Sequence, residues 1–304
     1  MWLHRSCLFT SLAFALLAYA QNAPRNSSAA AKPQATSEPA PVILDGWGRP
    51  ALDALKPGEK PGPAPRHDIS GIWEPARGPG DGIQPAGAHE MPRDGKPEHD
   101  PPYSPAGLAA QKSNKSLYGY GSVIMALSND PRNICDPVGF PRADLYQIRH
   151  TKIMQDAQSV VILYEFEHRF RVIWTDGREL PKEVPEPRYY GYSVGKWEDD
   201  TTLVVDTIGT MGNEKAWLDE GGHPTSEALH VQERFHRANN NLLELTVTID
   251  DPKMYTKPWV GMNKFPMRLQ PPDYDLVEQM CIPSEQDQYY KDYGDPASGT
   301  KRER

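Results

Sequence analysis

The sequence predicts a mainly β protein whose strands close into an antiparallel, up-and-down barrel. Three observations support this class. From about residue 145 onward, short apolar runs alternate with turn residues such as Asp176-Gly177 and Asn239-Asn240-Asn241. No helical periodicity interrupts these runs. Nine candidate strands in consecutive hairpins are best closed into a barrel, because closure leaves no exposed edge strand. A two-sheet sandwich is the alternative.

The strands are expected within a barrel domain of residues 141–285, followed by a flexible tail, 286–304. The stretch 160–174 is too long for one ordinary strand, so we expect a bend or bulge near Glu167. The nine candidate strands are 145–154, 160–166, 169–174, 189–197, 202–208, 228–236, 242–249, 265–269 and 276–281.

A proline-rich arm is predicted ahead of the barrel, over residues 42–140. Of the 31 prolines, 14 fall between Pro41 and Pro105, which argues against a packed sheet or helix there. Ile72 and Trp73 are costly to leave in water, so this arm should pack against the barrel through them. One short helix is expected at 106–116, because Ser104 is a good N-cap and Pro105 suits the first helical position.

The first residues have the pattern of a secretory signal peptide. A basic start is followed by an apolar stretch, 8–17, and by small residues at Ala18 and Ala20. We expect cleavage after Ala20, a disordered leader over 21–41, and a periplasmic or secreted protein. No later stretch approaches the roughly 18–20 apolar residues of a membrane helix, so no membrane insertion is expected.

Export affects the interpretation of the cysteines. Removal of Cys7 with the signal peptide leaves Cys135 and Cys281, for which a disulfide is preferred over two free thiols. The formal net charge of -8 argues against nucleic acid or an anionic membrane as a partner.

Candidate site residues follow from strand alternation, which places successive side chains on opposite faces. Glu233 shares a face with the apolar Leu229, Val231 and Phe235. Asp206 lies between Val204 and Ile208 on its own face, which predicts a buried carboxylate with a partner: Arg171, His168 or Arg149, in that order. The full candidate set for a ligand site is Tyr164, Glu165, His168, Arg171, Asp206 and Glu233.

Three functions fit these residues. The first is a barrel that binds a small, partly apolar ligand, and no cofactor is expected. The second is an enzyme, a lyase, isomerase or hydrolase, that uses Asp206 or Glu233 with His168 or His230. A metal site on His230 and His236 is disfavoured, because six strand residues span about 20 Å. The structural alternative for the acids is an ion pair that holds the barrel together.

Five stretches together resemble a family of exported bacterial proteins that is plentiful in acidobacteria and proteobacteria and has no established activity. They are NICDPVGFPR, YEFEHRFRVIWTDGREL, GYSVGKWEDDTTLVVDT, HPTSEALHVQERFHR and LTVTIDDPKMYTKPW. The resemblance covers roughly residues 66–285 and implies a lipocalin-like or calycin-like β domain. The chain departs from the family at Asp199, where glycine is usual, and at Pro224-Thr225-Ser226, where the family reads Pro-His-Ser.

Overall fold

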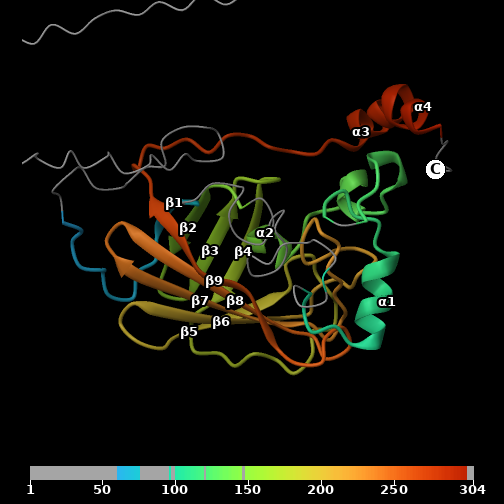
Figure 1. The fold of residues 1–304 in the computed structure, drawn as a ribbon. Coiled ribbons are helices and arrows are strands. Elements are labelled where there is room, and N and C mark those ends of the chain that lie inside the picture. Colours follow the sequence, from blue (N-terminus) through green and yellow to red (C-terminus); the bar gives the residue numbers. More distant parts are fainter. Residues whose placement is uncertain (1–59, 76–95, 97–99, 120, 146–147, 300–304) are drawn as a thin grey trace, which may run out of the picture. The chain divides into compact units, whose positions relative to one another are not determined.

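Nine strands close into a barrel, and each strand pairs with the next one along the chain (Figure 1). This computed structural model describes residues 60–75, 96, 100–119, 121–145 and 148–299, which belong to one compact unit. Strand β9 pairs with β1 and completes the ring. The predicted barrel is therefore confirmed, and the sandwich alternative is wrong.

All neighbouring strands are antiparallel except β4 and β5, which pair in parallel through Ile173 with Ser193 and Trp174 with Val194. The barrel is mixed rather than purely antiparallel, because residues 175–191 return to the starting end of β4 before β5 begins. The strands are β1 Gly71–Pro75, β2 Thr151–Gln155, β3 Ser159–Tyr164, β4 Arg169–Trp174, β5 Tyr192–Trp197, β6 Thr202–Ile208, β7 His230–Asn239, β8 Leu242–Asp250 and β9 Trp259–Leu269.

Strand β1 belongs to the barrel, although its sequence lies in the predicted irregular arm. It pairs with β2 on one side and with β9 on the other. The argument from proline content was wrong here because Pro75 is the last residue of the strand, where a missing N–H donor is tolerated. The expected burial of Ile72 and Trp73 is confirmed, and Trp73 Nε1 donates a 2.9 Å hydrogen bond to the Ile69 carbonyl.

The bend predicted near Glu167 is a complete chain reversal between β3 and β4. Glu167 and His168 both have left-handed backbone conformations, with φ of 61° and 49°. Residues other than glycine adopt this region at a cost of about 1–3 kcal/mol when the surroundings enforce it. The turn therefore holds the Glu167 side chain in a defined and strained position.

The barrel interior follows the alternation of β6, β7 and β8, in which buried and partly exposed residues alternate from Leu203 to Ile208, from His230 to Arg237 and from Leu242 to Asp250. These strands bury apolar side chains together with Thr207 and Glu233. The buried residues are Leu203, Val205 and Thr207 on β6, Val231, Glu233 and Phe235 on β7, and Leu243, Leu245, Val247 and Ile249 on β8.

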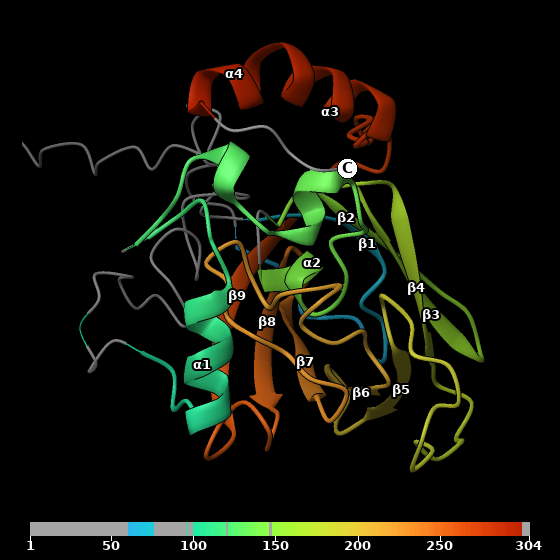
Figure 2. The ribbon, with the colours of Figure 1, turned by 90° about the vertical axis from the view of Figure 1, so that its right-hand side faces the viewer.

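Residues 138–145 fill one end of the barrel and finish in the short helix α2, Arg142–Leu145 (Figure 2). Every residue from Val138 to Leu145 is buried. Arg142 is anchored by a bidentate pair with Asp130, with N–O distances of 2.8 and 2.7 Å. This segment therefore brings Phe140 and Asp144 into contact with residues of the barrel wall.

Helix α1, Pro105–Ser113, begins as predicted. The Ser104 hydroxyl accepts a 2.9 Å hydrogen bond from the Gly107 amide. The helix packs closely on the chain after β8, since a Cβ at Gly107 would lie 1.9 Å from the Met254 carbonyl oxygen. Two 3-10 turns follow, η3 Met125–Leu127 and η4 Pro131–Ile134.

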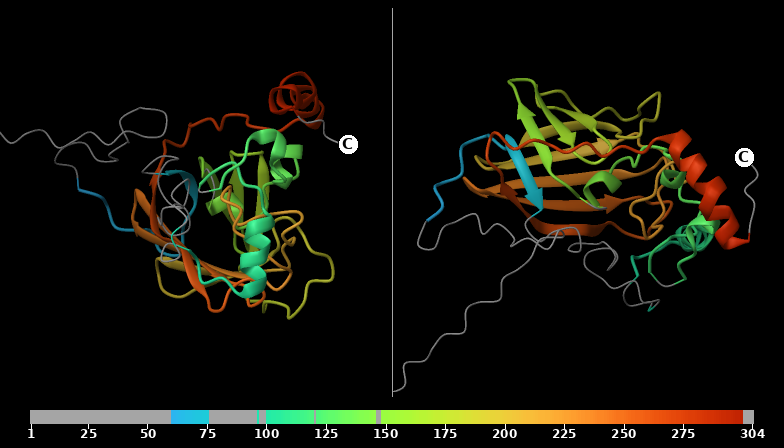
Figure 3. Two further views of the ribbon diagram at one scale, coloured as in Figure 1. Left: turned by 45° about the vertical axis from the view of Figure 1, so that its right-hand side comes forward. Right: turned by 90° about the horizontal axis from the view of Figure 1, so that it is seen from above.

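A segment that we call the strap, residues 270–282, crosses the outside of the barrel from β9 to the C-terminal helix (Figures 1 and 3). The Gln270 amide donates to the Ile72 carbonyl at 2.7 Å, which fixes its start on β1. The strand predicted over 276–281 is wrong, because this stretch meets the sheet through one isolated bridge between Gln279 and Phe166. Side chains hold the strap instead.

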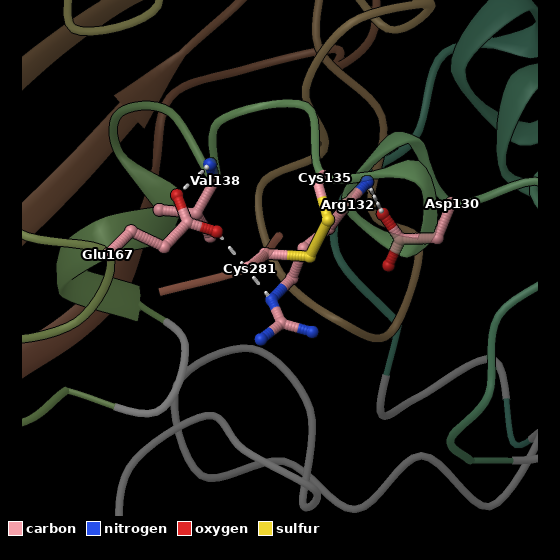
Figure 4. The surroundings of a disulfide bond; sticks show 6 residues. All are labelled: Asp130, Arg132, Cys135, Val138, Glu167 and Cys281. Atoms are coloured by element: carbon pink, nitrogen blue, oxygen red, sulfur yellow. Dashed lines mark hydrogen bonds and ion pairs between the residues drawn. A yellow bond between two sulfur atoms is a disulfide. The ribbon is translucent and has the colours of Figure 1, made fainter. Parts of the chain in front are cut away.

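The strap ends at a disulfide between Cys135 and Cys281, whose Cα atoms are 5.4 Å apart (Figure 4). The predicted bridge is confirmed, and the free-thiol alternative is wrong. Beyond it, α3 (Pro283–Tyr289), η5 (Tyr290–Gly294) and α4 (Asp295–Ser298) form continuous helix where a flexible tail was expected. Burial of the Tyr290 ring accounts for this order.

The predicted signal peptide, 1–20, and leader, 21–41, lie outside the described residues. None of the helices in the described ranges combines the length and apolar character needed to cross a membrane. The disulfide is of a kind that persists in oxidising compartments.

Candidate functional site

A bidentate ion pair crosses the barrel interior between β4 and β7, which are not neighbours in the sheet. Arg171 donates to both carboxylate oxygens of Glu233 at 2.8 and 2.7 Å. The Arg171 guanidinium also lies 4.0 Å from the centroid of the Phe140 ring. Both charged side chains are almost fully buried, so each depends on the other for its charge to be tolerated.

A second carboxyl group, that of Asp144 on α2, lies beside this pair. Its pKa is raised well above the ordinary value, first by burial and then by the charge of Glu233 and a hydrogen bond to it. Arg171 and the Tyr164 hydroxyl act in the opposite direction. Burial and the neighbouring Glu233 thus favour the neutral acid form of Asp144 beside the Arg171–Glu233 ion pair.

Several polar atoms of this polar cluster, defined as Asp144, Tyr164, Arg171 and Glu233, make no hydrogen bond of normal geometry within the described residues. They are Asp144 Oδ2, Tyr164 Oη and Arg171 Nε. The nearby Tyr190 Oη also makes no hydrogen bond of normal geometry within the described residues. The ring centroids of Tyr190 and Tyr164 are 5.8 Å apart. A buried polar atom without a hydrogen bond costs about 1–3 kcal/mol of stability, so these atoms favour the binding of a polar ligand atom.

Tyr190 links the polar cluster to Glu167 in the strained turn. Burial raises the pKa of Tyr190, and Glu167 is the charged group that adds most to this shift, with Asp144 contributing in the same direction. Burial also raises the pKa of Glu167, against the effect of a hydrogen bond from the Val138 amide. That amide lies 2.8 Å from Glu167 Oε2.

Glu167 lines a cavity of about 490 Å³ outside the barrel, which we call the end cavity. Figure 4 shows Glu167 and Arg132 beside the disulfide that closes this region. Glu167 Oε1 is 3.9 Å from Arg132 Nε and has no hydrogen bond of normal geometry. Apolar and aromatic surface comes from Phe166, Met280, Ile282 and Tyr289, and further polar lining from Glu278, Gln279, Glu285 and Gln286.

A buried histidine holds the strap against the barrel. His150 lies between Glu74, 3.5 Å from Nε2, and Glu165, 3.3 Å from Nδ1. From the strap, the Tyr274 hydroxyl is 3.0 Å from His150 Nδ1, and the Val277 amide donates to Glu165 at 3.3 Å. Burial alone would lower the pKa of His150, but the hydrogen bonds and charges of Glu165 and Glu74 outweigh it and raise the pKa.

Asp206 occupies the outer face of β6, contrary to the prediction that it is buried. Its side chain is 34% exposed and meets His230 at 2.9 Å and Gln232 at 3.1 Å, rather than Arg171, His168 or Arg149. The hydrogen bond from His230 lowers the pKa of Asp206. The prediction was wrong because Leu203, Val205 and Thr207 form the buried face of this strand.

The six predicted residues therefore separate into four places. Tyr164, Arg171 and Glu233 meet inside the barrel. Glu165 is buried under the strap, and Asp206 is on the outer face. His168 is exposed, with its Nε2 2.9 Å from the Val277 carbonyl of the strap. None of the six lines the end cavity.

Sequence reasoning missed Asp144, Glu167, Tyr190 and His150. Asp144 precedes the predicted strand 145–154 and lies in helix α2, so alternation does not apply to it, and His150 lies within the predicted strand but just before β2 begins at Thr151. For Glu167 a signal was present: the expected bend at this position already marked a special backbone conformation next to aromatic residues.

The segment that departs from the Pro-His-Ser pattern is a buried structural loop. Ser226 donates through both its amide and its hydroxyl to Asp251, at 2.6 and 2.7 Å. The Thr225 hydroxyl donates to the Ala216 carbonyl at 3.0 Å, and His223 Nδ1 lies 2.7 Å from Asp219. These polar groups satisfy one another within the loop, apart from the polar cluster.

Together, the fold and the site define a closed β-barrel with a buried acid–base cluster and a cavity at one end. Comparisons with protein-family profiles, with curated proteins and with solved structures find no match to this chain. The function must therefore be argued from the geometry.

Proposed function

We propose that the protein binds a small, partly apolar ligand in the end cavity. The observation that carries the proposal is the combination of volume and lining. About 490 Å³ lies within the range of roughly 300–1,000 Å³ typical of ligand pockets. Apolar side chains share the lining with a buried carboxylate oxygen of Glu167 that makes no hydrogen bond of normal geometry within the described residues. The disulfide and the strained turn hold two walls of the cavity, which lowers the entropic cost of binding.

The test uses methionine methyl groups as reporters. Met280 lines the end cavity, whereas Met154 is exposed on β2 and does not. Compounds from a library of small, partly apolar molecules should shift the ¹³C-methyl resonance of Met280 and leave that of Met154 unchanged. Native mass spectrometry of protein purified from its own host identifies any ligand that it retains. Library compounds that move both methyl groups equally, or neither, contradict the proposal.

An enzyme is the second candidate, and the polar cluster favours it. Two adjacent carboxyl groups whose environments differ, one paired with Arg171 and the other with a raised pKa, form the arrangement expected of a proton donor beside a fixed charge. In this alternative Asp144 is the general acid, and the hydroxyls of Tyr164 and Tyr190 bind the polar atoms of the substrate. The reaction class is proton transfer in a lyase, isomerase or hydrolase.

This alternative requires turnover that depends on Asp144. A screen of ester hydrolysis, and of hydrogen exchange next to carbonyl groups in deuterated water, should find an activity that Asp144→Asn abolishes while the protein stays folded. The activity should decline as pH rises through the raised pKa of Asp144, because the acid form is the proton donor. Activity that survives Asp144→Asn rules out this role.

Export and family membership are part of the same proposal. The disulfide and the basic, then apolar, N-terminal sequence support export to the periplasm or secretion. The five quoted stretches support membership of the exported bacterial family that they resemble. Edman sequencing of the protein from its host should start after Ala20, and an N-terminus at Met1 would contradict export.

A further inference from the structure

Two buried hydrogen-bond acceptors that line the end cavity make no hydrogen bond of normal geometry within the described residues. They are Glu167 Oε1, which has an ion pair with Arg132 Nε at 3.9 Å, and Gln279 Oε1. A ligand that satisfies them must donate hydrogen bonds, as an ammonium, amidinium or guanidinium group does.

The charges of the residues that line the cavity also favour a cationic ligand. Three acidic residues of the lining, Glu167, Glu278 and Glu285, face one basic residue, Arg132. Glu278 and Glu285 are exposed and have no ion pair with any residue that the structure describes. An anionic ligand would meet uncompensated negative charge, whereas a cation would relieve it.

The single cation of the cavity is already engaged. The Arg132 guanidinium lies 4.8 Å from the centroid of the Phe166 ring, and its Nε is 3.9 Å from Glu167 Oε1. The Tyr289 ring also lines the cavity and is 45% exposed. An aromatic face of this kind attracts a second cation, and Met280 and Ile282 offer apolar surface to the body of the ligand.

We infer that the end cavity takes a small organic cation, in which an amine, amidine or guanidine is carried by an apolar or aromatic body. The inference rests on the proposed function and specifies its ligand class. In the complex, the cationic nitrogen donates to Glu167 Oε1 and Gln279 Oε1, and the body lies against Met280 and Tyr289. Glu278 and Glu285 attract the cation from the rim.

The test compares three probes of nearly equal size: benzylamine, which is cationic at neutral pH, benzyl alcohol and benzoate. Titrations at low salt follow the ¹³C-methyl resonance of Met280. Benzylamine should bind about tenfold more tightly than benzyl alcohol, because charge-assisted hydrogen bonds replace neutral ones, and benzoate should bind most weakly. The advantage of benzylamine should shrink as salt is added.

Variants separate the ligand class from mere binding. Glu167→Gln keeps the acceptor for the Val138 amide but removes the charge, and should remove most of the advantage of benzylamine. Glu278→Gln with Glu285→Gln should lower the affinity for benzylamine about threefold. The matched control, Glu183→Gln with Glu186→Gln, removes the same charge from exposed residues outside the cavity lining and should leave the affinity unchanged.

The outcomes distinguish the two levels of the proposal. If benzyl alcohol or benzoate binds at Met280 as tightly as benzylamine, the cavity binds ligands but the cationic class is wrong. Equal losses of affinity in the rim variant and its matched control would also overturn the class, because they would indicate a general effect of net charge. If none of the three probes shifts Met280, the inference fails, and a library without hits at Met280 removes the proposed function as well.

Discussion

The two adjacent carboxyl groups inside the barrel should respond oppositely to the same chemical change. Glu233→Gln and Asp144→Asn each replace a carboxyl group by an amide of nearly equal shape. Glu233 accepts both hydrogen bonds from Arg171, so its amide leaves a buried guanidinium without a counter-charge. Asp144 is held neutral by its raised pKa, and its amide can still donate to Glu233.

The expected magnitudes differ several-fold. Removal of one partner of a buried pair costs about 3–5 kcal/mol, which we expect for Glu233→Gln. Asp144→Asn should change the free energy of unfolding at pH 7 by less than about 1 kcal/mol, because it replaces one neutral donor by another. Urea unfolding at pH 7, followed by tryptophan fluorescence with the disulfide intact, measures both values.

The pH dependence gives an independent check. Because the pKa of Asp144 is raised in the folded state, its contribution is fully present below the ordinary value near 3.8 and is lost as pH rises through the folded pKa. Wild-type stability should therefore fall relative to that of Asp144→Asn over this window. If Asp144→Asn instead stabilises the protein by several kcal/mol at pH 7, wild-type Asp144 is ionised there and the charge assignment is refuted.

Three further changes probe the strap, the disulfide and helix α1. The His150 pKa is raised, so the bond from the Val277 amide to Glu165 should weaken and its hydrogen exchange accelerate as pH rises from about 6.5 through the folded pKa. Cys135→Ser with Cys281→Ser opens a loop with a sequence separation of 146 and should cost about 4–5 kcal/mol in urea unfolding. Gly107→Ala should lower the thermal midpoint despite its better helix propensity, because its Cβ would meet a backbone oxygen at 1.9 Å.

Each change has its own control. Because amide exchange is itself base-catalysed, the comparison uses the protection factor of Val277. His150→Gln should abolish the pH dependence of this factor, and an unchanged dependence would assign it to another group. For the disulfide, a loss below about 1 kcal/mol would show that the strap is held without it. Ala109→Gly, at an exposed site of the same helix, tests propensity alone, and Gly107→Ala must be the more harmful of the two.

Alternation was sufficient to predict part of the interior. Glu233 shares a face with apolar neighbours on its own strand, so it was expected to point inward, and it pairs there with Arg171. The same reasoning failed for Asp206, because both faces of β6 carry branched apolar residues and the pattern does not say which one turns inward. That choice is made by β7, whose buried face opposes Leu203, Val205 and Thr207.

The remaining site residues depend on contacts between distant parts of the chain. Asp144 acquires its raised pKa from burial and then from Glu233, 89 positions later, and no local pattern encodes that approach. Glu167 lines the cavity because a disulfide brings Cys281 to Cys135 and carries the strap with it. The proline count gave the wrong prediction at β1 because composition averages over a long segment. A strand of five residues needs only a short stretch without an internal proline.

The place of β1 in the ring has a consequence for how the barrel can be taken apart. This strand comes from the N-terminal side of α1, yet it closes the gap between β2 and β9. A chain that starts at α1 would keep eight strands and expose two unpaired edges, which are templates for aggregation. It should also accept a donor strand. A synthetic peptide containing Gly71–Pro75 should insert between β2 and β9, place its tryptophan in the vacated core and suppress this aggregation.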